Sequence, residues 1–130
     1  MKKRLFLLPL LLVVLGCNDV RPPIEGRADP FVPPQVSFAS GELRNDTAVG
    51  TPILTHNQSG LLTVTVPFRS AIDKTLYVDY SVTFFDENHV SLGTSGPFTK
   101  VLEANTPDQI TFTSPWKQAA DFQMSCRYAR

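Results

Sequence analysis

Few side chains in this sequence could do chemistry, and the cysteines and histidines come first. A cysteine thiolate beside a histidine base can act as a nucleophile, so Cys126 with His56 or His89 is the pair to consider. Cys126, however, falls on the apolar parity of an alternating run, residues 122–128. A cysteine in that position behaves as a small hydrophobe. We therefore expect a core thiol, no catalytic residue and no enzymatic activity.

A metal site is also not expected. The two histidines lie 33 positions apart with no third ligand near either, whereas a metal needs three or four converging donors. Residues 86–88 carry oxygen donors, but the other ligands and the glycine of an EF-hand loop are missing. Asp and Asn suit turns, so this segment is predicted to be a hairpin turn. No glycine-rich phosphate loop or nucleophile elbow occurs, and we expect no cofactor.

The charge balance argues against two classes of partner. The chain carries 12 basic and 12 acidic side chains. If the three basic residues at positions 2–4 are removed by processing, 9 basic side chains remain and the net charge becomes −3. A mildly acidic domain lacks the clustered positive charge that binds nucleic acid, and it has no basic patch that would attract anionic lipid.

The N-terminus has the features of a targeting signal. Three basic residues precede an unbroken apolar run of eleven residues, 5–15. As a helix this run would be about 16 Å long, roughly half the thickness of a bilayer's hydrocarbon core. Residues 1–16 are therefore predicted to be a signal peptide.

The end of this signal resembles the lipobox of bacterial lipoproteins. The motif here is Val14-Leu15-Gly16-Cys17. The resemblance implies transfer of a diacylglyceryl group to the Cys17 thiol, cleavage between Gly16 and Cys17, and acylation of the new amine. Two or three acyl chains anchor a protein stably. The alternative is an ordinary secretory signal followed by a chance cysteine.

The residue after the lipidated position bears on localisation. In enterobacteria-like sorting an Asp there retains a lipoprotein in the inner membrane, and this chain has Asn18. We expect the inner leaflet of the outer membrane, facing the periplasm. Residues 17–35 are rich in proline, which favours an extended conformation. They are predicted to be a lipidated N-terminus and linker before a domain at 36–130.

Period-two alternation dominates that domain and predicts β-strands. Along residues 61–69 the apolar side chains share one face, and Pro67, which lacks a donor, indicates an edge or an irregular point. The predicted strands are residues 61–69, 76–86, 90–92, 98–102, 109–113 and 122–128, with a turn at 93–97 and weaker candidates at 36–43 and 52–55. Six to eight short strands with regular turns predict an all-β, antiparallel sandwich.

The strand-rich part of the chain resembles a known family. Residues 60–70, 74–92 and 114–128 are similar to the uncharacterised bacterial lipoproteins typified by YcfL. Three features match. The first is a Leu-Leu-x-Val strand, and the second is an aromatic pair followed by Asp, here Phe84-Phe85-Asp86. The third is a lead-in to the last strand, here Pro115, Ala119 or Ala120, and Phe122. The resemblance implies an immunoglobulin-like sandwich on a lipid anchor and carries no established activity.

Exposed aromatics are the remaining lead to function. Tyr77 and Phe85 fall on the outward parity of their strand, and Trp116 falls in a loop. Aromatics are favoured at interfaces, so these three residues are the candidate site for an envelope protein partner. A covering loop, or the Trp116 segment, could instead bury Phe85. The rival functions are a ligand carrier or enzyme with a cleft near the histidines, and a phage-type lipoprotein that blocks a receptor.

Overall fold

The computed structural model describes residues 31–130, which form eight strands and one short helix. The predicted signal peptide, the Gly16–Cys17 cleavage site and most of the linker lie outside the described residues. The elements are β1 (Val36–Phe38), α1 (Gly41–Asp46), β2 (Thr47–Val49), β3 (Ile53–His56), β4 (Leu62–Ser70), β5 (Leu76–Phe85), β6 (Ser91–Leu102), β7 (Gln109–Thr113) and β8 (Asp121–Tyr128). No helix within residues 31–130 is long and apolar enough to cross a membrane.

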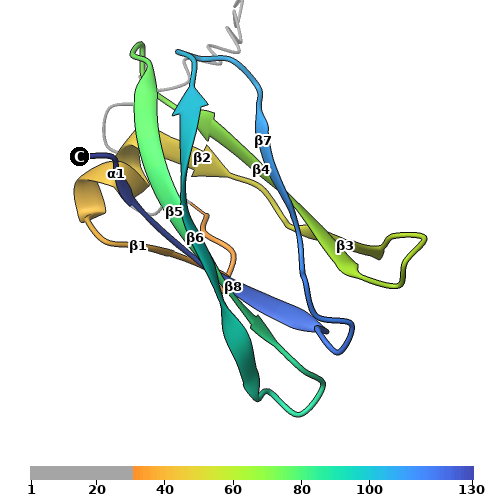
Figure 1. Cartoon of the computed structure of the whole chain (residues 1–130). Helices are drawn as coiled ribbons and strands as arrows, with labels where there is room; N and C mark the ends of the chain where they lie inside the picture. Colours follow the sequence, from red (N-terminus) through yellow and green to blue (C-terminus); the bar gives the residue numbers. More distant parts are fainter. Residues whose placement is uncertain (1–30) are drawn as a thin grey trace, which may run out of the picture.

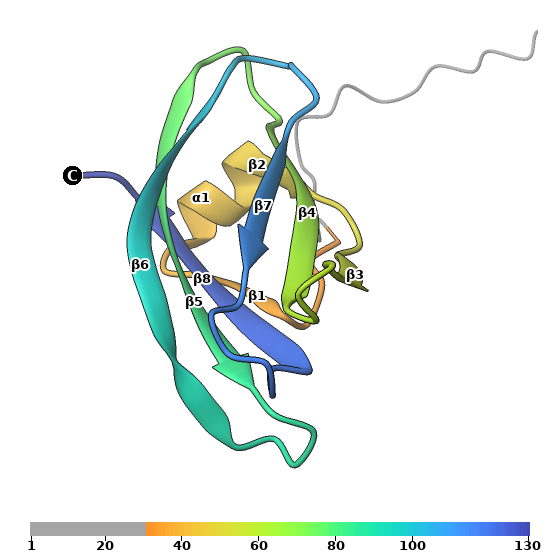
Figure 2. The same ribbon diagram turned by 45° about the vertical axis from the view of Figure 1, so that its right-hand side comes forward.

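Two sheets pack face to face, as Figures 1 and 2 show. The first sheet has the order β1-β8-β5-β6, in which β1 runs parallel to β8 and the other pairs are antiparallel. The second sheet is built around β4. Strands β3 and β7 both pair with residues 63–65 of β4, so they lie on its opposite edges, and β2 pairs with the far end of β4. The predicted all-β sandwich is confirmed.

The alternation of apolar residues explains how the sheets meet. In β4 every second side chain from Leu62 to Phe68 is almost fully buried, and the intervening ones are not. Strands β5 and β8 show the same alternation. Aromatic rings join the sheets in the centre, where the Phe112 ring lies 5.9 Å from that of Phe84 and 5.4 Å from that of Phe122. The predicted inward faces of these strands therefore form the core.

The predicted turn at residues 93–97 is not formed. β6 instead runs from Ser91 to Leu102 without interruption beside β5. The register shifts between Tyr80 and Val82, which takes up the extra residue as a bulge. Gly96 has a φ of 106° at this point, which suits glycine. Gly96 and Pro97 thus lie in a β-bulge within a strand, not in a loop between two strands, and Gly93 pairs with Phe84 beside a second register shift.

The predicted strand at 36–43 ends early, and a helix follows it. β1 stops at Phe38, and Ser40 caps α1 by accepting a hydrogen bond from the Leu43 N–H at 3.3 Å. A serine in this position stabilises a helix start. Leu43 has the opposite strand parity to the inward-facing Val36 and Phe38, and it is completely buried because it projects from a helix and not from a continued strand. α1 carries the chain from the first sheet to the second and leads directly into β2, which was not predicted.

Pro67 lies within the central strand of its sheet, at an irregular point. The Phe68 N–H donates to the Asp108 carbonyl beside β7, so the nitrogen of Pro67 faces the opposite edge. On that edge the partner of β4 changes from β3 to β2, and the Gly50 N–H donates to the Pro67 carbonyl at 2.8 Å. The missing donor of proline therefore falls where no strand needs it.

Candidate functional site

Cys126 is a core residue of β8. Its side chain is 1% exposed, and burial raises the pKa of the thiol to about 12. A thiolate is the reactive form of cysteine, and burial keeps this residue protonated at neutral pH. The structure agrees with the expectation of a buried thiol.

The two histidines occupy different places at the surface. His56 ends β3, and His89 lies in the turn between β5 and β6, where it adopts a φ of 62°. His56 faces an open cavity of about 450 Å³ that is also lined by Glu87 and Lys117. Among residues 31–130, no three His, Cys, Asp or Glu side chains are placed to hold one metal ion.

The turn that follows β5 is held by its own first side chain. The Asp86 carboxylate accepts hydrogen bonds from the N–H groups of Asn88 and Val90, at 2.8 and 2.9 Å. The predicted hairpin turn is therefore formed, and its aspartate serves the backbone.

The structure does not bring Tyr77, Phe85 and Trp116 together. Tyr77 and Phe85 lie near opposite ends of β5, a separation of about 26 Å at roughly 3.3 Å per residue. Trp116 is half-buried against the core, with its ring 6.0 Å from that of Phe84. Glycine at position 93 makes room for the indole, because a Cβ there would lie 2.5 Å from Trp116 Cη2.

Tyr77 has an exposed apolar neighbour that was not among the residues predicted from the sequence. It pairs across the strands with Val101 of β6, and the two side chains are 57% and 40% exposed. The next pair along the sheet is polar: the Thr99 hydroxyl donates to the Asp79 carboxylate at 2.6 Å, and Arg127 lies 3.9 Å from the same group. Tyr77 and Val101 thus form an apolar pair with a polar border on the outer face of the first sheet. The outward parity of Val101 was the available signal.

Phe85 is half-buried at the other end of that face. It lines an open cavity of about 330 Å³ together with Pro34, His89 and Gln123. The segment before β1 lies beside it, and the Ala120 N–H, at the end of the Trp116 segment, donates to the Phe85 carbonyl at 2.8 Å. Phe85 is therefore partly covered by its own chain.

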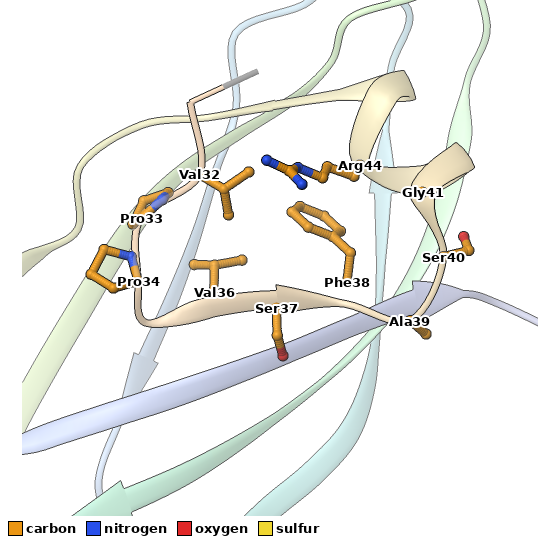
Figure 3. A pocket seen from close by; sticks show the side chains of 10 residues that line it. All are labelled: Val32, Pro33, Pro34, Val36, Ser37, Phe38, Ala39, Ser40, Gly41 and Arg44. Atoms are coloured by element: carbon orange, nitrogen blue, oxygen red, sulfur yellow. The ribbon is translucent and has the colours of Figure 1, made fainter. Parts of the chain in front are cut away.

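A second feature that the sequence did not predict is a hollow between β1 and α1. It has a volume of about 430 Å³. Figure 3 shows the side chains of Val32, Val36 and Phe38 pointing into it, with Arg44 of α1 lying across it. The open edges of the two sheets meet at α1, so this hollow is an opening into the side of the sandwich.

Comparison with known proteins supports the fold. Neither the family models nor the curated proteins gave a match. Among solved structures, the chain is similar to the Campylobacter jejuni protein cj0090, with a TM-score of 0.63 and 18% identity over 73% of this chain and 98% of that one. It is also similar to a DUF1425 family member from Shewanella sp. pv-4, with a TM-score of 0.55 and 22% identity over 65% of this chain and 79% of that one. At these identities the likeness shows a shared fold.

Proposed function

We propose that this chain is a YcfL-type envelope lipoprotein, anchored by lipid on Cys17, whose sandwich binds a protein partner and catalyses no reaction. Two findings support the family assignment. Residues 60–128 resemble that family in sequence, and the sandwich is similar in fold to a DUF1425 protein. The motif at residues 14–17 supports the anchor, and Asn18 favours the outer membrane, facing the periplasm.

The observation that carries the binding role is the apolar pair Tyr77–Val101. A partner that covers Tyr77, which is 57% exposed, and Val101, which is 40% exposed, would gain free energy by removing their apolar surface from water. Large rigid aromatics bordered by polar groups are typical of the centre of protein interfaces. We assign the partner contact to Tyr77 and not to Phe85 or Trp116, because the latter two are half-buried against their own chain.

Photo-crosslinking in cells tests the partner assignment. We expect p-benzoylphenylalanine at position 77 of the full chain to give an adduct of discrete mass, and the substitution Val101→Asp to abolish it. Position 123 is the matched control, because Gln123 is exposed on the same face of the sheet but pairs with the far part of β5. The assignment fails if position 77 gives no adduct, or if Val101→Asp leaves the adduct unchanged while the thermal melt shows a folded protein.

A separate measurement tests the anchor. Mass spectrometry of the protein from membranes should find Cys17 as the first residue, carrying a diacylglyceryl group and an amide-linked acyl chain. Cys17→Ser should leave the signal uncleaved, and density separation should place the wild-type chain with the outer membrane. An unmodified Cys17, or cleavage at another bond, would contradict the proposal.

A further inference from the structure

We propose that the hollow between β1 and α1 binds a single-chain amphiphile with a carboxylate head, of the medium-chain fatty acid class. This inference goes beyond the proposed function and does not depend on the partner of Tyr77. It rests on three features: an apolar wall, a cation that makes no ion pair among residues 31–130, and a backbone N–H that has no acceptor among the same residues.

The wall of the hollow belongs to the core of the sandwich. Val36 is 5% exposed, and the Phe38 ring lies 6.1 Å from the ring of Phe68 on the facing sheet. Val32 closes one end and packs against the same core. The volume of about 430 Å³ falls within the range of small-molecule sites, roughly 300–1,000 Å³. An apolar chain could therefore lie against the side of the core.

The cation is Arg44. In Figure 3 its side chain extends over Phe38 with the guanidinium end directed toward Val32. Arg44 makes no ion pair and no side-chain hydrogen bond within residues 31–130. Asp46, the acidic residue two positions after Arg44, accepts a hydrogen bond from the Tyr128 hydroxyl instead. A guanidinium over an apolar surface is suited to a carboxylate, which it can bind through two parallel hydrogen bonds.

The free donor is the backbone N–H of Phe38. The Ala39 N–H donates to the Cys126 carbonyl of β8 at 2.8 Å. Because successive N–H groups of a strand point to opposite sides, the Phe38 N–H points away from β8 to the open edge. It has no partner within residues 31–130. An anionic head at this edge could therefore accept hydrogen bonds from both Arg44 and the backbone, with its chain beside Val36.

Photo-labelling with a diazirine derivative of decanoic acid tests this site. The full chain is reconstituted in phosphatidylcholine vesicles, and labelled residues are mapped by mass spectrometry. We expect label within residues 32–44, competed by decanoate but not by acetate or decyltrimethylammonium. Arg44→Glu should reduce the labelling at least about tenfold, since a charged hydrogen-bonded pair is replaced by repulsion. Arg44→Lys should give labelling between that of the wild type and that of Arg44→Glu, because lysine keeps the charge but lacks the paired donors of a guanidinium.

The matched control is Arg69→Glu, which reverses an exposed arginine on β4 and should leave the labelling unchanged. Arg44 is exposed, so both variants are expected to fold, and their thermal melts verify this. The proposal is overturned if Arg44→Glu labels as strongly as the wild type, or if the label spreads outside residues 32–44. In a chain with p-benzoylphenylalanine at position 41, which lines the hollow with open space around it, crosslinks to residues 18–30 in the absence of the fatty-acid probe would show that the chain's own linker occupies the site, and would also overturn it.

Discussion

The chemistry of Cys126 is set by where its side chain lies. The thiol is buried, and its pKa is raised from 9.0 to about 12. We expect iodoacetamide at pH 8 to leave the Cys126 peptide unmodified in the native protein and to modify it fully in urea. Mass spectrometry of that peptide gives the readout. Rapid modification of the native protein would mean that the core around β8 opens readily.

The same thiol makes stability depend on alkaline pH. Above pH 9 the unfolded chain releases the Cys126 proton, whereas the folded chain holds it until about pH 12. The unfolded state then binds fewer protons, so the free energy of unfolding falls as the pH rises through this window. Urea titrations at pH 8 and pH 10.5 should show a larger loss for the wild type than for Cys126→Ala. An equal loss in the two proteins would assign the effect to the tyrosines.

The hydrogen bond from the Tyr128 hydroxyl to Asp46 ties the last strand to the end of α1. Burial raises the pKa of Tyr128, and the hydrogen bond to Asp46 and the nearby negative charges raise it further. Hydrogen bonds to charged groups are worth about 1.5–3 kcal/mol, so Tyr128→Phe should lower the free energy of unfolding by about 1–2 kcal/mol. Tyr77→Phe is the control, since that exposed hydroxyl makes no side-chain hydrogen bond within residues 31–130. Equal effects would show that the contact with Asp46 contributes nothing.

At the scale of elements, two glycines should respond to alanine in opposite directions. At Gly93 a Cβ would collide with the Trp116 ring, and the φ of 149° is unfavourable for a side chain. At Gly41, in the first turn of α1, nothing lies within 4 Å of an added Cβ. Gly93→Ala should lower the free energy of unfolding by about 2 kcal/mol or more, because the added methyl group overpacks the site. Gly41→Ala should raise the free energy of unfolding by about 0.5–1 kcal/mol, because alanine restricts the unfolded chain more than glycine does. Thermal melts of the two variants compare these directly, and a harmless Gly93→Ala would show that the Trp116 segment moves freely.

The elements that could be predicted are those whose pattern is local. β4 and β5 alternate without interruption, so their faces and most of their bounds follow from sequence. α1 is only six residues long, too short for a helical period to stand out after β1. Its signals are the cap at Ser40 and the parity of Leu43, which a continued strand would have pointed away from the core. The glycine and proline of β6 signal a turn and so predict two strands, whereas pairing with β5 absorbs Gly96 and Pro97 as a bulge. Long-range pairing overrode local preference there.

In the whole molecule, the sites that the sequence could not reveal are those formed by segments that lie apart in the chain and meet only in the fold. The parity of Tyr77 along its strand is enough to predict that its side chain is exposed, and the structure confirms this. The sequence predicts that Trp116 lies in a loop, but nothing in its own segment shows that Gly93 leaves space for the ring. The hollow beside Arg44 needs β1, α1 and the chain before β1 to meet, and each of these is short. Its residues carry no common spacing that a motif could express.

The segment before β1 belongs to the packing of the whole molecule. Val32 contacts the core, Pro33 is buried, and the Val36 N–H donates to the Pro33 carbonyl at 3.0 Å. The Met124 N–H of β8 also donates to the Gln35 carbonyl, at 2.7 Å. These contacts precede the position, residue 36, at which alternation in the sequence begins.

Two shortened chains measure what those contacts contribute. A chain beginning at residue 31 keeps all of them, whereas one beginning at residue 36 exposes apolar surface and leaves the buried Met124 N–H without its acceptor. An unsatisfied buried donor costs about 1–3 kcal/mol, and losing the burial of a valine adds about 1 kcal/mol. The free energy of unfolding, measured in urea, should therefore be about 2–4 kcal/mol lower for the chain from residue 36 than for the chain from residue 31. Equal stabilities would mean that residues 31–35 only pass over the surface, and that the hollow beside Arg44 lacks the fixed wall that a ligand requires.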